Sequence, residues 1–443
     1  MAILLTGFFG LVTAQEGVTP QTALRHYVEK PDLSYQWEVM DSLRSDSLMV
    51  YNVMLTSQTW KNIVWKHQLT VLVPDHATAS GALLYITGGS VEDGQPRWNT
   101  DTGDRHFRVA EYIARQNGAP VAVLRQTPNQ PLYGGKKEDE LISMTLHRYK
   151  ETKDYEWPLL FPMVKSAVRA MDAVQGLIKE RRSMAVDRFT VTGLSKRGWT
   201  TWLTAAADPR VTAIAPMVID VLNMPISLQY QIETWGDYSV EIQDYVNLGI
   251  PQEAATPDGK EITTMVDPYS YRHSLTMPKM LFMGTNDPYW VVDNVKHYLD
   301  SIPGENRLHY VPNAGHDLDD GQQAARALSA FFGSTLRGTE LPNVDWKWVP
   351  KRKKAKIVVE ADREELVGVS VWSAASVDKD FRNDEWSSHT VRKRRKGIIP
   401  VTVDLPVEGY RAYYVDLEYE SPAGGVYTQS TRVFVVDGNG LCQ

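Results

Sequence analysis

Residues 190–198, Thr-Val-Thr-Gly-Leu-Ser-Lys-Arg-Gly, join an apolar β-type run to a helix-like segment through a glycine and a single serine. This pattern is typical of a nucleophile elbow, in which a strand ends in a sharp turn that holds a serine at the start of a helix. A serine hydroxyl is a weak nucleophile, so it must be fixed, exposed and next to a base. The usual Gly-x-Ser-x-Gly motif has its second glycine two residues after the serine, whereas this chain has Arg197 there and Gly198 one residue later. The segment predicts an α/β architecture and makes Ser195 a candidate nucleophile.

An acid and a base follow this serine where such a fold needs them. The run 279–284 predicts a short buried strand that leads to Asp287, and the run 307–311 predicts a second strand that leads to His316. Because the carboxyl ends of parallel strands meet at one edge of a sheet, the order Ser195, Asp287, His316 fits an α/β-hydrolase triad. We expect His316 to act as the general base and Asp287 to orient its imidazole.

Other interpretations of the acid and the base stay open. Asp220, at the end of an apolar run, and Asp293 are alternative acids. Asp287 precedes a proline and His316 follows a glycine, so each also fits an ordinary turn. The triad is favoured because the three residues occur together, in order and each at a strand end.

Paired glycines end a further predicted strand, within the run 81–89. Small residues let backbone N–H groups approach a reacting carbonyl closely. We therefore predict an oxyanion hole made by the N–H of Lys196 and one N–H from Gly88, Gly89 or Ser90.

Strand-like and helix-like runs alternate along residues 15–340, which predicts an α/β-hydrolase domain: a mainly parallel sheet flanked by helices. The remaining predicted strands span 47–56, 64–74, 119–125 and 211–219, and the main predicted helices span 158–181 and 289–299.

A long insertion, from about residue 221 to 277, separates two of the predicted strands. Insertions at this point of the fold commonly form a lid over the serine, and aromatic side chains there and nearby wall a substrate pocket. Trp235, Tyr289 and Trp290 are the candidate pocket residues. The alternative is that such aromatic residues pack the lid onto the core.

The sequence pattern changes in the tail, residues 341–443. Short alternating runs separated by turn-rich breaks predict an immunoglobulin-like β-sandwich domain. Such a domain can present substrate, bind a surface or stabilise the core, and the sequence does not choose among these roles. A carbohydrate-binding role is a further alternative, for which the candidates are Trp346, Trp348, Trp372 and Trp386.

Composition limits the partners and cofactors. The formal net charge of −7 gives no electrostatic case for nucleic acid, so we expect a small-molecule or peptide substrate. The basic runs 351–354 and 392–396 would permit at most a weak contact with an anionic surface.

The single cysteine, Cys442, excludes a disulfide within the chain and a thiolate metal cluster. The histidines lack paired ligand spacing and no phosphate loop or dinucleotide fingerprint is present, so neither a metal nor another cofactor is expected. The sequence does not predict the oligomeric state.

The first 14 residues are apolar and end in small residues, but they lack the usual positive n-region. This pattern predicts a signal peptide cleaved near Ala14, hence a secreted or periplasmic protein.

Several motifs carry a resemblance to a known family. Gly193-Leu-Ser-Lys-Arg-Gly-Trp199, the segment 126–132, the segment 284–290 and Asn313-Ala-Gly-His316 together resemble the PhoPQ-activated pathogenicity-related proteins. The resemblance spans most of the chain and implies an exported α/β-hydrolase with a triad and a poorly defined substrate. The elbow is also similar to that of glucuronoyl esterases, where a basic residue follows the nucleophile. By that analogy the Lys196 side chain would stabilise the oxyanion.

The sequence thus predicts an exported serine hydrolase that cleaves an ester or amide bond through an acyl-enzyme. One alternative is a non-catalytic binding or signalling protein that retains the hydrolase fold. Another is a carbohydrate esterase that resembles the glucuronoyl esterases.

Overall fold

The computed structural model describes residues 17–362, 364–392 and 397–442. The predicted signal peptide and most of the basic run 392–396 lie outside these residues. Within them, no helix has both the length and the apolar character that a membrane span requires.

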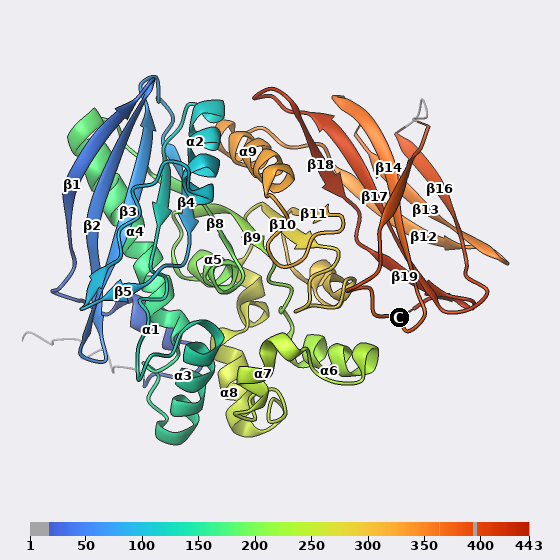
Figure 1. Ribbon diagram of the computed structural model, residues 1–443, viewed down its shortest axis with the longest axis horizontal. Coiled ribbons are helices and arrows are strands. Elements are labelled where there is room, and N and C mark those ends of the chain that lie inside the picture. The colour runs from blue at the N-terminus through green and yellow to red at the C-terminus, as the bar shows by residue number, and fades with distance from the viewer. Residues whose placement is uncertain (1–16, 363, 393–396, 443) are drawn as a thin grey trace, which may run out of the picture.

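A mainly parallel sheet forms the centre of the molecule, as the sequence predicts (Figure 1). Its strands are β1 (Gln36–Ser45), β2 (Leu48–Trp60), β3 (Ile63–Pro74), β4 (Gly81–Ile86), β7 (Val121–Leu124), β8 (Arg188–Leu194), β9 (Val211–Met217), β10 (Lys279–Gly284) and β11 (Asn306–Val311). The order in the sheet is β1-β2-β3-β7-β4-β8-β9-β10-β11. The strands from β7 to β11 are parallel, and β1, β2 and β3 extend one edge as antiparallel neighbours. The parallel order brings the carboxyl ends of β8, β10 and β11 to one edge.

Helices cover both faces of this sheet (Figure 1). They are α1 (Ala23–Glu29), α2 (Arg105–Asn117), α4 (Leu160–Arg182), α5 (Lys196–Ala207) and α9 (Gln322–Arg337). Alternate residues of β4 point to opposite faces: Leu84 packs into the core with α1, α4 and α5, and Leu83 into the core with α2 and α9. A strand covered on both sides must be apolar along its whole length, which is why β4 reads as a continuous apolar run.

The predicted lid lies between β9 and β10, and helix α3 packs beside it (Figure 1). These elements are α3 (Glu138–Thr152), α6 (Met224–Trp235), the 3-10 helix η1 (Val240–Ile242), α7 (Gln243–Val246), α8 (Pro257–Val266) and the 3-10 helix η2 (Pro268–Ser274). A short hairpin, β5 (Val91–Glu92) and β6 (Gln95–Pro96), follows β4.

The helix predicted over 289–299 is wrong in extent. The structure has two short 3-10 helices instead, η3 (Asn294–His297) and η4 (Leu299–Ser301). Tyr298, between them, has a φ of −146°, which no helix accommodates.

The tail folds into two antiparallel sheets. One has the order β12-β13-β16, and the other contains β18, β17, β14 and β15, with β19 on β17. The strands are β12 (Val344–Pro350), β13 (Lys354–Ala361), β14 (Leu366–Ser376), β15 (Ser387–Thr390), β16 (Ile398–Asp404), β17 (Tyr410–Glu420), β18 (Val426–Ser430), β19 (Phe434–Asp437) and β20 (Gly440–Leu441).

One feature of the tail was not predicted from the sequence. Strand β18 pairs with β11 at Leu308 and Ser430, so the larger tail sheet continues the central sheet (Figure 1). The tail therefore shares an edge with the strand that leads to His316. The basic run 351–354 is exposed and occupies the turn from β12 to β13.

Candidate active site

Ser195 stands between β8 and α5 in the conformation of a nucleophile elbow. Its φ of 57° and ψ of −124° lie where non-glycine residues are rare and strained. The two flanking glycines explain the unusual spacing of the motif. A Cβ at Gly193 would lie 2.7 Å from Arg197 Cβ, and one at Gly198 would lie 2.9 Å from the carbonyl oxygens of Gly193 and Met217. Glycine is required where α5 crosses β8 and β9, and in this chain that crossing falls at Gly198 rather than at Arg197.

The structure brings the three candidate triad residues together. His316 Nε2 lies 2.7 Å from Ser195 Oγ, and His316 Nδ1 lies 2.8 Å from Asp287 Oδ2 and 3.0 Å from Oδ1. The Asp287 side chain is 5% exposed and that of His316 is 21% exposed. With a proton on Nδ1, the imidazole donates to the carboxylate and leaves Nε2 free to accept the serine proton. This arrangement is chemically suited to general-base activation of a hydroxyl.

Neither alternative acid contacts His316. Asp220 is buried beside Asn294, whose Nδ2 lies 3.3 Å from Asp220 Oδ1, and burial raises the pKa of Asp220 to about 7. Asp293 accepts a hydrogen bond from the Tyr230 hydroxyl at 2.9 Å and pairs with Lys296.

Two neighbouring contacts hold the acid and the base. The backbone N–H of Tyr289 donates to Asp287 Oδ1 at 2.9 Å. The Tyr289 ring stacks on the imidazole of His316, with the ring centroids 4.0 Å apart and the planes at 26°. A single residue thus fixes both partners of the serine.

The predicted oxyanion donors occupy two different places. Lys196 is the first residue of α5, where the backbone N–H groups of a helix have no partner within the helix, and it lines a pocket together with Ser195. Gly88, Gly89 and Ser90 follow β4 and are not among the residues that line this pocket. A Cβ at Gly88 would lie 2.7 Å from Arg197 Nη2, so this glycine makes room for the Arg197 guanidinium.

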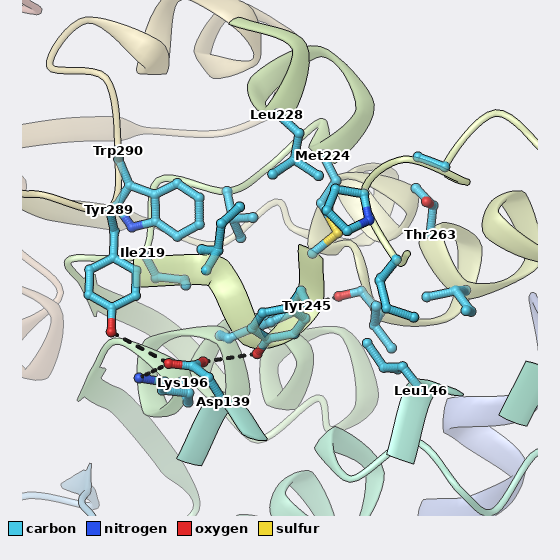
Figure 2. A pocket seen from close by; sticks show the side chains of 18 of the residues that line it. Asp139, Leu146, Lys196, Ile219, Met224, Leu228, Tyr245, Thr263, Tyr289 and Trp290 are labelled. Atoms are coloured by element: carbon cyan, nitrogen blue, oxygen red, sulfur yellow. Dashed lines mark hydrogen bonds and ion pairs between the residues drawn. The ribbon is translucent and has the colours of Figure 1, made fainter. Parts of the chain in front are cut away.

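The pocket beside Ser195 has an empty volume of about 750 Å³, open solvent at its mouth included. Residues of the predicted lid form most of its wall, and Tyr289 and Trp290, two of the candidate pocket residues, also line it (Figure 2). Trp235, the third candidate, has a different position. Its indole does not line this pocket and instead lies 4.0 Å from the guanidinium carbon of Arg382 in the tail. Trp235 is the last residue of α6, and this places it at the contact between lid and tail.

Sequence reasoning missed Asp139, at the start of α3. Its Oδ2 lies 2.6 Å from Lys196 Nζ, its Oδ1 accepts from the Tyr245 hydroxyl at 2.9 Å, and the Tyr289 hydroxyl lies 3.4 Å from Oδ2 (Figure 2). Burial, and then the charge of Asp139, raise the pKa of both tyrosines. The Lys196 side chain is therefore neutralised by a carboxylate, which differs from the role that the glucuronoyl-esterase analogy implies.

A second ion pair anchors the next residue of the elbow. Arg197 binds Glu138 through two bonds of 2.6 and 2.7 Å, and its Nε donates to the carbonyl of Thr127 at 2.5 Å. Burial raises the pKa of Glu138, but the charge and hydrogen bonds of Arg197, with smaller contributions from Gln130 and Lys196, together outweigh burial, so the pKa lies below its usual range. Consecutive acids thus face consecutive bases, and this complementary pattern is the signal in the sequence from which Glu138 and Asp139 could have been found.

The described residues contain no group of three or more His, Cys, Asp or Glu side chains arranged to hold a metal ion. The Cys442 thiol is free and partly buried.

Comparisons with known proteins give the following matches. Residues 24–382 match the sequence profile of the PhoPQ-activated pathogenicity-related proteins. Over 432 aligned residues the chain is 29% identical to Autocrine proliferation repressor protein A of Dictyostelium discoideum, with 90% of this chain and 86% of that protein covered.

Two solved structures illustrate the structural matches. The acetyl xylan esterase 1 of Thermoanaerobacterium sp. is 16% identical with a TM-score of 0.49, covering 72% of this chain and 93% of that one. A glucuronoyl esterase of Solibacter usitatus is 13% identical with a TM-score of 0.40, covering 69% of this chain and 90% of that one.

Proposed function

This chain belongs to the PhoPQ-activated pathogenicity-related protein family, and from that premise we propose that it is a serine hydrolase that cleaves an ester or amide bond. The observation that carries the proposal is the chain of hydrogen bonds from Ser195 through His316 to Asp287. The strained backbone of Ser195 supports it, because a fold maintains such strain mainly where function uses it.

In the proposed reaction, Ser195 Oγ attacks the substrate carbonyl carbon while its proton passes to His316 Nε2. The carbonyl electrons move to oxygen, then return as the bond to the leaving group breaks, and His316 gives its proton to that group. A water molecule repeats the sequence on the acyl-enzyme: it loses a proton to His316, releases the acid and restores the serine. Asp287 stabilises the imidazolium in both halves.

The proposed oxyanion site uses the backbone N–H of Lys196, supported by its position at the first turn of α5. We keep Gly88, Gly89 or Ser90 as the source of the second N–H, which would require the loop after β4 to face the substrate carbonyl. In this scheme the Lys196 ammonium acts mainly on Asp139, whose charge would otherwise oppose an oxyanion nearby.

The proposal includes export to the periplasm or beyond, supported by the signal-like residues 1–14. It also assigns residues about 221–277 to a lid and residues 341–443 to an immunoglobulin-like β-sandwich, supported by the two facing antiparallel sheets of the tail. A weak contact of the basic runs with an anionic surface is part of the same proposal. N-terminal sequencing of the mature protein tests the export step.

Labelling with a fluorophosphonate probe tests the triad. We expect the native protein to react at Ser195 and the Ser195→Ala variant not to react. The two proteins should have the same circular dichroism spectrum. Labelling that persists in Ser195→Ala, or a native protein that neither labels nor hydrolyses p-nitrophenyl acetate, contradicts the proposal.

A second candidate is a signalling role that does not require catalysis. It is favoured by the similarity to a protein named as an autocrine proliferation repressor. The Ser195→Ala variant separates the two candidates, because a signalling role independent of catalysis would survive the substitution.

A further inference from the structure

We propose that the pocket beside Ser195 receives the acyl half of the substrate and selects an uncharged aliphatic acyl chain of medium length. This inference rests on the proposed hydrolase function and names the class of substrate. It is argued from the wall of the pocket, from its charges and from the position of His316.

The wall of the pocket is apolar over nearly all of its extent. Residues 224, 228 and 262 of the proposed lid (Met224, Leu228 and Ile262) line it together with Trp199 and Ile219. Met224, Leu228 and Ile219 are labelled in Figure 2. Counted as space for the centres of water-sized spheres, the cavity has a volume of about 80 Å³, which is room for several water molecules and exceeds what an acetyl group would fill. Burying a chain against such a wall is favourable in proportion to the apolar area covered.

The charges in the pocket are already paired. Among the described lining residues, the charged side chains are Asp139 and Lys196, which lie 2.6 Å apart. The tyrosine hydroxyls on Asp139 satisfy its remaining oxygens. A charged acyl group would enter without a free counter-ion, and burying an unpaired charge is costly. The pocket therefore selects against carboxylate and ammonium groups on the acyl side.

The position of His316 decides which half of the substrate enters. The leaving group must lie beside His316 Nε2, which gives it a proton. Ser195 and Lys196, which would flank the substrate carbonyl in the proposed reaction, line the pocket. His316 is not among the residues that line it. The Tyr289 ring lines the pocket and covers one face of the imidazole. The leaving group is thus on the outer side, and the acyl chain points into the pocket.

The test compares hydrolysis of p-nitrophenyl acetate, butyrate, octanoate and laurate by the whole chain. We expect kcat/KM to rise from acetate to octanoate, by up to about fourfold for each added methylene group. In a parallel series of alkyl acetates, in which only the alcohol lengthens, kcat/KM should change less than twofold.

Two tryptophan substitutions on the same helix provide the matched pair. Leu228 lines the pocket, while Ile226 is 47% exposed. We expect Leu228→Trp to lower kcat/KM for octanoate about tenfold more than kcat/KM for acetate, and Ile226→Trp to change neither. Circular dichroism and thermal unfolding show whether Leu228→Trp has folded.

The outcomes separate this inference from the proposed function. Labelling of Ser195 and hydrolysis of acetate without any gain from a longer acyl chain would overturn the inference alone. A dependence on alcohol length instead of acyl length would overturn it equally. Absence of both labelling and hydrolysis would overturn the proposed function and the inference with it.

Discussion

Asn313 and Trp386 form two reciprocal hydrogen bonds between the loop that carries His316 and the tail. Asn313 Nδ2 donates to the carbonyl of Trp386 at 2.9 Å, and the N–H of Trp386 donates to Asn313 Oδ1 at 2.7 Å. The loop with Asp287 is held in the same way, because Asn286 Nδ2 donates to the carbonyl of Asp384 at 2.9 Å. The Trp386 side chain is buried, which fixes this segment of the tail. The tail is thus in contact with both loops that position the imidazole.

Removing the side chain of Asn313 tests whether the tail aligns His316. Asn313 has a φ of 58°, so Asn313→Gly removes both hydrogen bonds without adding backbone strain. We expect kcat for p-nitrophenyl acetate to fall by about tenfold or more with KM within twofold, because small misplacements of a catalytic group have large effects on rate. Steady-state kinetics measure the split between kcat and KM.

A glycine at another left-handed position controls for general loosening of the backbone. Asp46 has a φ of 48° in the turn between β1 and β2, far along the sheet from the triad. Asp46→Gly should leave kcat unchanged. Equal losses in the two variants, or none in Asn313→Gly, would show that the tail contact does not position the base.

The Lys196–Asp139 pair predicts non-additive effects on catalysis. Lys196→Met keeps an apolar wall and the backbone N–H, but leaves the Asp139 charge unpaired near the reacting carbonyl. We expect kcat to fall by about tenfold, and the double variant with Asp139→Asn to recover much of that loss, a coupling of about 1–2 kcal/mol. Kinetics of the four proteins in a double-mutant cycle measure the coupling, and strictly additive losses would refute it.

The periodicity of the sequence predicted the architecture because each core strand of the sheet is covered on both faces. The run 81–86 and the run 280–284, which follows Lys279, are apolar throughout, and β4 and β10 lie there. The order of Ser195, Asp287 and His316 predicted their meeting point, since parallel strands deliver their ends to one edge. The helix expected over 289–299 was wrong because apolar spacing does not report a residue with extended φ such as Tyr298.

The hydrophobic pattern of the sequence could not predict contacts between segments that are distant along the chain. Trp235 is aromatic and belongs to the lid, yet its ring meets Arg382, far along the chain. Pairing of Ser430 with Leu308 depends on how the tail docks, which no local run encodes. Asp139 was missed because its partner, Lys196, lies on another helix, although the adjacent charges 138–139 and 196–197 are complementary.

The placement of Trp235 predicts a stability effect without a catalytic one. Its ring lies 4.0 Å from the Arg382 guanidinium carbon, a cation–π contact between lid and tail. We expect Trp235→Ala to lower the free energy of unfolding by about 1–2 kcal/mol, from the lost contact and packing. Hydrolysis of acetate and octanoate should stay within twofold of the native rates. A selective loss of octanoate hydrolysis would contradict this prediction and would indicate that Trp235 contacts the substrate.

Asp220 predicts a specific pH dependence of stability. Burial, which dominates over its hydrogen bonds, raises its pKa in the folded protein to about 7 from a usual value of 3.8. The folded state therefore binds this proton more tightly than the unfolded state, so the free energy of unfolding decreases as the pH rises from about 4 to about 7. Asp220→Asn keeps the shape and removes the charge. At pH 8 we expect the variant to unfold at a higher temperature than the native protein, with a free energy of unfolding larger by an amount on the order of 2–4 kcal/mol. At pH 4 the two proteins should differ little. Thermal unfolding followed by circular dichroism at both pH values makes the comparison, and an equal shift at the two would mean that Asp220 does not titrate in this range.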